Sequence, residues 1–179
     1  NGKAHFCTSM KGYGTTYPGG FAEYAVVPEK QVYHLPDALS FEAGSQSETL
    51  SCCINGIDLC HLKAGANVLV IGAGPIGLMM LQLAKMSGAG KLIVSELVPE
   101  KQALAKKLGA DVVIDPSKED IRAAIDRECE NLDCVIEAAG TPFTQKQAIE
   151  LAGKCCTVML FGLVAPETEI IVKPFSIFQ

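Results

Sequence analysis

Three glycines and one acid in this sequence have a spacing that is typical of a ligand-binding site. Gly72, Gly74 and Gly77 form a G-x-G-x-x-G pattern, and Glu96 comes 19 residues after the last glycine. The first glycine allows a tight turn, the second lets backbone approach a pyrophosphate, and the third lets a helix pack close to a strand. A helix that begins there presents free N–H groups and the positive end of its dipole to phosphates. The pattern therefore predicts a dinucleotide site.

The segments around the glycines decide how much weight the pattern carries, because glycine-rich turns also follow strands that bind no ligand. Residues 68–71 are all apolar, as expected of a parallel strand covered on both faces. Residues 76–86 are apolar nearly all round and predict a deeply packed helix. A strand over 91–96 ends in Glu96, which completes a βαβ unit and puts the carboxylate where an adenosine ribose binds.

Strands and helices keep alternating after this unit, which indicates an α/β fold with a doubly wound parallel sheet. We predict further strands over 111–115, 132–137 and 156–161, and helices over 99–108 and 142–152. Ser117 and Asp120 have capping-box spacing, which predicts another helix through about residue 128. Gly140 and Gly162 follow two of these strands, at the edge where open parallel sheets bind ligands. Glycine also ends strands for structural reasons alone, but together with the G-x-G-x-x-G pattern the ligand interpretation is favoured.

The first 60 residues predict a different kind of structure. Residues 1–20 have the composition of irregular chain, and residues 21–27 and 32–35 predict short strands. Helices are expected over 40–46 and 48–60.

Composition and charge argue against several partners and locations. Of the 179 residues, 49% are hydrophobic, and 15 basic against 20 acidic side chains give a net charge of −5. That charge disfavours nucleic acid and anionic membranes, and no apolar run approaches the ~18 residues of a membrane span. Eight cysteines occur without a C-x-x-C pair, which favours buried thiols in a reducing cytoplasm over a disulfide framework.

Several segments together resemble the medium-chain zinc-dependent alcohol and polyol dehydrogenases. They are residues 19–28 (GGFAEYAVVP), 72–77, 94–96, 99–101 and 107–111, and the resemblance covers essentially the whole chain. The sorbitol, threonine and galactitol-phosphate dehydrogenase branch is the most similar. One departure is Thr49, where the family commonly has proline between Glu48 and Leu50.

The resemblance implies a fragment with two domains. Residues 1–48 match the last part of a GroES-like catalytic domain, and residues 49–179 match a Rossmann domain without its sixth strand. The family's zinc-binding cysteine and Gly-His-Glu segment have no counterpart here. We therefore expect the chain alone not to turn over, and we expect the unpaired edge of its sheet to favour homo-oligomers.

The resemblance and the glycine pattern together imply NAD as the cofactor. Glu96 would hold the adenosine ribose, and neither Leu97 nor Val98 is a cation that could hold the 2′-phosphate of NADP. Lys101 matches a position that reaches the ribose, although a solvated lysine fits it nearly as well. Ile76 is implied to pack under the nicotinamide. The predicted cofactor-binding residues are Gly72, Gly74, Pro75, Ile76, Gly77, Glu96, Lys101, Ala139, Gly140, Gly162 and Leu163, of which Gly162 and Leu163 are implied to hold the carboxamide.

Glu48 and Cys7 are the two predicted metal ligands. Glu48 matches an acid that binds the catalytic zinc or a metal-bound water, and it is also the one predicted catalytic residue. A glutamate at a helix N-terminus can equally be there because its negative charge interacts favourably with the positive end of the helix dipole. Cys7 matches the fourth ligand of a structural-zinc lobe whose other three cysteines are not in this sequence. The complete enzyme is implied to oxidise a secondary alcohol or polyol, with zinc stabilising the alkoxide and NAD taking the hydride.

Three alternatives stay open at this point. A zinc-free quinone reductase of the same superfamily would favour NADPH, against which Glu96 and Cys7 argue. A methyltransferase that binds S-adenosylmethionine usually carries an acid just before the first glycine, where this chain has Val70 and Ile71. A binding module without catalysis is favoured only by the missing catalytic parts.

Overall fold

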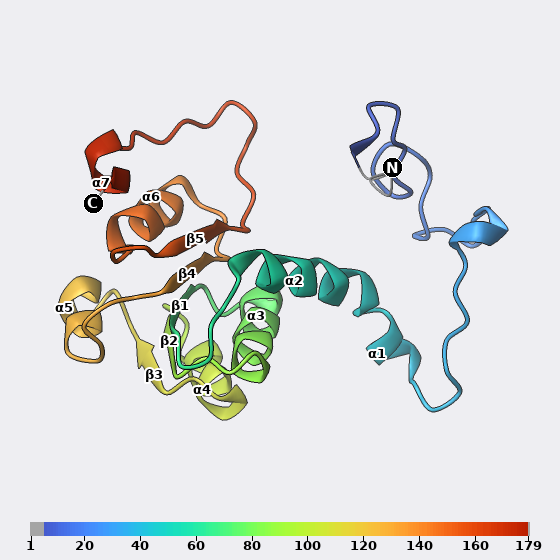
Figure 1. The fold of residues 1–179 in the computed structure, drawn as a ribbon. Coiled ribbons are helices and arrows are strands. Elements are labelled where there is room, and N and C mark those ends of the chain that lie inside the picture. The colour runs from blue at the N-terminus through green and yellow to red at the C-terminus, as the bar shows by residue number, and fades with distance from the viewer. Residues whose placement is uncertain (1–5, 179) are drawn as a thin grey trace. The chain divides into compact units, whose positions relative to one another are not determined.

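The computed structural model describes residues 6–178 and divides the chain into two compact units, which meet in sequence between Gly44 and Ser45 (Figure 1). The division lies just before helix α2 (Ser47–Cys60), whereas the boundary expected at residue 48 would fall inside that helix. Glu48 thus belongs to the same unit as the glycine turn.

The first unit is mostly irregular. It contains a short 3-10 helix, η2 (Glu29–Gln31), and one helical turn, α1 (Phe41–Gly44), where the Ser40 hydroxyl accepts a hydrogen bond from the Ala43 N–H. The strands predicted over 21–27 and 32–35 do not form within the described part of this unit. Phe21, Tyr24 and Val26 are almost fully exposed, so these apolar side chains of the first segment form no core that would hold a strand. An isolated extended segment has no partner for its backbone groups and is not stable as a strand.

The second unit contains five parallel strands. They are β1 (Asn67–Ile71), β2 (Lys91–Ser95), β3 (Val112–Ile114), β4 (Cys134–Glu137) and β5 (Thr157–Leu160). Their order in the sheet is β3-β2-β1-β4-β5, so the chain winds outward from β1 first in one direction and then in the other. The predicted doubly wound parallel sheet is confirmed. Ligands of such sheets bind where the order reverses, above the carboxyl end of β1.

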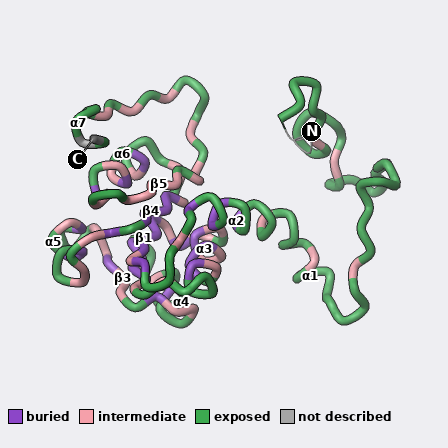
Figure 2. Tube along the Cα trace, viewed as in Figure 1, coloured by how far each residue is buried: buried purple, intermediate pink, exposed green. Residues whose placement is uncertain are grey.

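Helices cover both faces of the sheet (Figure 1). On one face α2, α3 (Pro75–Met86) and α4 (Pro99–Leu108) pack over the apolar side chains of β1, β2 and β4. On the other face α5 (Ile121–Asp126) and α6 (Pro142–Leu151) form a second cluster with the alternate strand residues. A last short helix, α7 (Pro174–Phe178), ends the described chain. Figure 2 shows the buried residues concentrated along the strands and inner helix faces.

Each buried apolar side chain of the strands belongs to one of these two clusters, which is why the strands are apolar without alternation. Among the described helices, none has both the length and the apolar character that a membrane crossing requires.

Candidate cofactor site

The glycine turn connects β1 to α3, and two of its glycines are required by close contacts. Gly72 has a φ of +95°, and a Cβ there would lie 3.1 Å from the Cβ of Ala139. A Cβ on Gly77 would lie 1.9 Å from the carbonyl oxygen of Gly72, so α3 approaches the strand as closely as glycine permits. Gly74 differs, because a Cβ there would meet nothing within 4 Å. The space above Gly74 is open on the side from which a ligand could approach.

The N-terminus of α3 has no side chain that caps it. Gly74 is the N-cap residue and Pro75 the first helical residue, which has no N–H to satisfy. The remaining N–H groups of the first turn therefore face the open space, where a negatively charged group would be stabilised. Ile76 is half-buried and packs against the core cluster on that face of the sheet.

Glu96 lies directly after β2 and binds the glycine turn. Its Oε2 accepts a hydrogen bond from the Ala73 N–H at 2.7 Å, and its Oε1 accepts from the N–H groups of Leu97 and Val98, both at 2.9 Å. A carboxylate offers about four acceptor positions, so three backbone donors leave one, on Oε2. That position suits a single hydroxyl donor such as a ribose oxygen.

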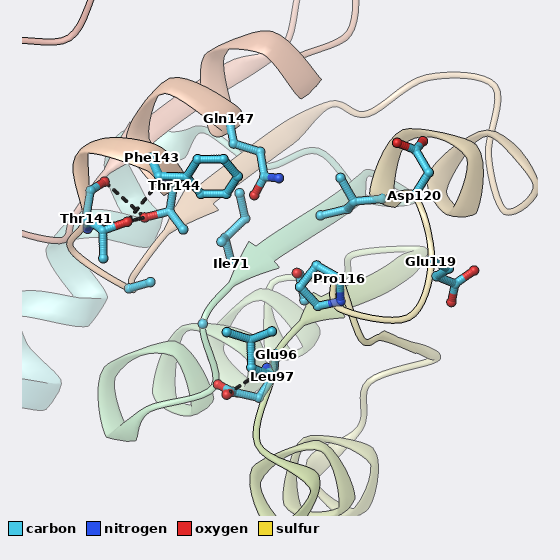
Figure 3. Close-up of a pocket in the computed structure, with 14 residues that line it drawn as sticks. Ile71, Glu96, Leu97, Pro116, Glu119, Asp120, Thr141, Phe143, Thr144 and Gln147 are labelled. Atoms are coloured by element: carbon cyan, nitrogen blue, oxygen red, sulfur yellow. Dashed lines mark hydrogen bonds between the residues drawn. The ribbon is translucent and has the colours of Figure 1, made fainter.

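A cavity of about 460 Å³ opens beside Glu96 at the carboxyl ends of β1 and β2 (Figure 3). Leu97 and Phe143, both largely exposed, line it, as does Ile71 at the end of β1. Its lining also includes the carboxylates of Glu96, Glu119 and Asp120 but no lysine, arginine or histidine. The 14 lining residues are Ile71, Gly72, Ser95, Glu96, Leu97, Pro116, Glu119, Asp120, Ile121, Ala139, Thr141, Phe143, Thr144 and Gln147.

The two further acids are held by their own contacts. Asp120 is the N-cap of α5 and accepts a hydrogen bond from the Ala123 N–H at 2.8 Å. Glu119 forms an ion pair with Arg127. Neither acid was predicted as a site residue, since only the pairing of β3 with β2 brings them to the cavity that Glu96 lines.

Gly140 and Gly162, the predicted residues after β4 and β5, lie against each other. A Cβ on Gly162 would be 2.4 Å from the nitrogen of Gly140. The Leu163 side chain is 91% exposed at the same edge of the sheet. Lys101 is exposed on α4 and does not line the cavity beside Glu96.

Glu137, the last residue of β4, is a buried acid that the sequence did not single out. It is fully buried, and its Oε1 accepts hydrogen bonds from the Ala139 and Gly140 N–H groups and from the Thr144 hydroxyl. An acid at the end of an otherwise apolar strand, followed directly by Ala-Ala-Gly, was the one available signal.

The predicted metal ligands are not brought into a cluster. Glu48 is exposed in the first turn of α2, where its Oε1 accepts a 3.4 Å hydrogen bond from the Cys52 thiol and raises the pKa of that thiol. Cys7 is an exposed free thiol of the other unit. Nowhere among residues 6–178 do three or more His, Cys, Asp or Glu side chains lie close enough to hold a metal. The described residues therefore do not fit a zinc ion by themselves.

Comparison with known proteins decides the family. The family described as zinc-binding dehydrogenase matches residues 75–179. This chain belongs to that family. The L-threonine 3-dehydrogenase of Pyrococcus furiosus is 36% identical over 99% of this chain and 51% of its own length. The resemblance to the alcohol and polyol dehydrogenases, including their threonine dehydrogenase branch, is confirmed.

Two solved structures of relatives extend the comparison. A zinc-binding dehydrogenase from Sinorhizobium meliloti bound to NADP shares 36% identity, with a TM-score of 0.91 over 97% of this chain and 52% of its own. An alcohol dehydrogenase from Escherichia coli complexed with NADH shares 30% identity, with a TM-score of 0.86 over 96% of this chain and 51% of its own. The 179-residue chain spans about half the length of the relatives that it matches. The family match argues against the methyltransferase alternative.

Proposed function

We propose that this chain is the NAD-binding portion of an oxidoreductase that oxidises a secondary alcohol or polyol by transferring a hydride to NAD. The observation that carries the proposal is the meeting of two features at the glycine turn after β1. The uncapped N-terminus of α3 lies beside the open space over Gly74, and Glu96 lies across the turn with one acceptor position left. Pyrophosphate suits the first feature and a ribose hydroxyl suits the second.

The walls of the cavity supply a place for the adenine. Leu97 and Phe143 offer apolar surface, and a flat aromatic base is stabilised when it covers such side chains. These residues bind and orient; the cofactor, when bound, supplies the hydride chemistry. Ile76, Gly162 and Leu163 remain proposed contacts of the nicotinamide half, and Lys101 a proposed contact of the ribose.

The charge of the cavity supports NAD rather than NADP. Three carboxylates and no cation line it, and a 2′-phosphate on the ribose would meet repulsion from Glu96 without any compensating donor of positive charge. NADP is the second candidate, favoured by the NADP-bound relative from Sinorhizobium meliloti. If NADP is the cofactor, the corresponding function is that of a zinc-free, NADPH-dependent quinone reductase.

The part of Glu48 and Cys7 in metal binding also remains a proposal. Residues 1–48 are proposed to be the end of the catalytic domain and residues 49–179 the Rossmann domain. The two candidate ligands lack a third among the described residues, so no step is assigned to zinc here, and the chain alone is proposed not to turn over. The complete enzyme is proposed to be cytoplasmic and homo-oligomeric, with a small alcohol or polyol as substrate and without nucleic-acid or membrane partners.

Calorimetric titration of the 179-residue chain with NADH and NADPH tests the choice of cofactor. We expect NADH to bind at least about tenfold more tightly, which corresponds to about 1.4 kcal/mol. Equal affinities, or tighter binding of NADPH, would exclude the NAD assignment, and S-adenosylmethionine should not bind.

Incubation of the chain with zinc, NAD and a polyol tests the proposed inactivity. It should produce no NADH, and steady production of NADH would contradict the proposal.

A further inference from the structure

Glu137 is the only acid or base that is buried among the described residues. It ends β4, where it pairs with Ile71 of β1 on one side and Leu160 of β5 on the other. A buried carboxylate is costly unless hydrogen bonds replace the water that it loses. Its contacts therefore indicate what the fold uses it for.

These contacts join the two turns that follow β4 and β5. Oε1 accepts from the N–H groups of Ala139 at 2.9 Å and Gly140 at 2.7 Å, and from the Thr144 hydroxyl at 2.8 Å. The backbone oxygen of the same residue accepts from the N–H groups of Phe161 at 3.0 Å and Gly162 at 2.9 Å. One residue thereby fixes the turn after each strand.

The second carboxylate oxygen lies beneath the turn after β5. Oε2 accepts no hydrogen bond from the described part of the chain, and a Cβ on Gly162 would lie only 2.6 Å from it. The Gln145 side chain donates to the Gly162 oxygen at 2.8 Å from the other side. Gly162 is thus seated directly on the buried carboxyl group.

The two turns lie at different places along the carboxyl edge of the sheet. Ala139 in the turn after β4 lines the adenosine cavity, and so does Thr144, whereas no residue of β5 or of residues 161–163 does. A dinucleotide that crosses the glycine turn with its adenosine at β2 has its second half toward the ends of β4 and β5, on the other side of β1. Glu137 therefore holds one turn that borders the adenosine cavity and one that only the second half would meet.

We propose that Glu137 is a positioning residue that fixes the backbone of Ala139, Gly140 and Gly162 for the cofactor. The proposal rests on the proposed function for its ligand. Glu137 does not touch the cofactor, since it is fully buried. Its effect passes through the backbone groups that it orders. Its loss should therefore weaken the binding of the adenosine half through Ala139, and that of the whole dinucleotide more strongly, because only the dinucleotide also reaches the turn at Gly162.

The test compares NADH with ADP-ribose, which lacks the nicotinamide, in titrations of the full 179-residue chain. Glu137→Leu removes the acceptor, and we expect the Kd of NADH to rise at least about tenfold and that of ADP-ribose by a smaller factor, about threefold. Glu137→Gln keeps an oxygen that can accept the same three bonds, so it should bind NADH within about threefold of the unmodified chain. Should Glu137→Leu not fold, Glu137→Asp takes its place, because its shorter side chain cannot reach both backbone donors.

Val135→Ala is the matched control. Val135 is fully buried in the same strand and belongs to the core cluster that α5 and α6 cover. Its truncation should lower the melting temperature and leave the ratio of the two Kd values unchanged. Equal losses of NADH and ADP-ribose in Glu137→Leu would overturn the proposal. Equal Kd values for the two ligands in the unmodified chain would overturn it too.

Amide hydrogen exchange separates this proposal from the proposed function. Ala139 and Gly140 should exchange at least about tenfold faster in Glu137→Leu than in the unmodified chain, with or without nucleotide. Unchanged exchange overturns the positioning role even if NADH binds. Faster exchange in a chain that binds neither NADH nor ADP-ribose overturns the proposed function, and with it the assigned ligand, while the hydrogen-bonding role of Glu137 stands.

Discussion

Glu96 and Ala73 are joined by a 2.7 Å hydrogen bond from the backbone N–H of Ala73 to Oε2 of Glu96. The bond ties the end of β2 to the glycine turn that follows β1. The carboxylate proposed to bind the ribose therefore also holds the backbone that would approach the phosphates. A change at Glu96 should alter the affinity for the cofactor and the stability of the turn together.

Glu96→Gln tests this double role. An amide oxygen can replace only one of the two carboxylate oxygens, so an NH2 group must face either Ala73 or the N–H groups of Leu97 and Val98. We expect the Kd of NADH to rise about tenfold and the preference over NADPH to narrow, because the charge that repels a 2′-phosphate is gone. Both ligands are titrated by calorimetry.

Glu100→Gln is the control for the loss of one negative charge. Glu100 is exposed in the first turn of α4 and does not line the cavity, so its substitution should leave the preference between the cofactors unchanged. An undiminished preference for NADH in Glu96→Gln would show that another group selects the cofactor.

Gly74→Ala should weaken NADH binding and leave the stability unchanged, whereas Gly77→Ala should lower the stability. A methyl group at Gly74 meets no atom of the protein within 4 Å, so the melting temperature should stay the same while the methyl occupies the approach of the pyrophosphate. We expect the NADH affinity of Gly74→Ala to fall at least about tenfold. A methyl group at Gly77 would lie 1.9 Å from the oxygen of Gly72, and overpacking of this kind typically costs about 1–3 kcal/mol.

Thermal unfolding and NADH titration of both variants check this contrast. Gly77→Ala should melt at a lower temperature than Gly74→Ala. Full NADH affinity in Gly74→Ala would mean that no phosphate passes over that glycine.

The sheet was predictable because its strands carry their own signals. Residues 68–71 and 134–136 lie in apolar runs bounded by polar or turn residues, and apolar side chains are all that burial on both faces of a parallel sheet requires. The position of Glu96 after β2 followed from the same reasoning. Residues 21–27 have an equally good strand pattern, but a strand also needs a partner, and alternation does not reveal whether one is present.

Features that depend on contacts between distant segments could not be predicted. Ser117 was expected to cap a helix, but its N–H and hydroxyl donate to Asp115, and Asp120 caps α5 instead. Serine and aspartate can both cap a helix, so the spacing alone does not show which of the two residues caps α5. The conformation of the turn after β3 decides it. Glu137 resembles a solvated acid at a strand end until β5 and its turn cover it.

Glu48 should control the reactivity of Cys52. The hydrogen bond from the Cys52 thiol to the Glu48 carboxylate favours the protonated thiol and raises its pKa above the ordinary value of 9.0. Glu48→Gln should lower that pKa, which increases the thiolate fraction at pH 8 and speeds alkylation by iodoacetamide about twofold or more. The rate at each cysteine is followed by peptide mass spectrometry.

Cys155 provides the internal control, since it is exposed and remote in sequence from Glu48. Its rate should be the same in both proteins. An unchanged rate at Cys52 would mean that Glu48 does not hold the thiol in solution.

The edge of β5 should make the chain self-associate. Among the described strands β5 pairs only with β4, its residues are less buried than those of β1, β2 and β4, and Leu160 is 42% exposed. A free edge with exposed apolar side chains can pair with another chain, and a lysine on such an edge opposes that pairing.

Light scattering over a concentration series should show association of the unmodified chain and a shift toward monomer in Leu160→Lys. Leu59→Lys replaces a comparably exposed leucine that lies on helix α2 and on no strand, so this variant should associate like the unmodified chain. A clean monomer at high concentration would show that the chain does not associate, and equal effects of the two lysines would place the association outside β5.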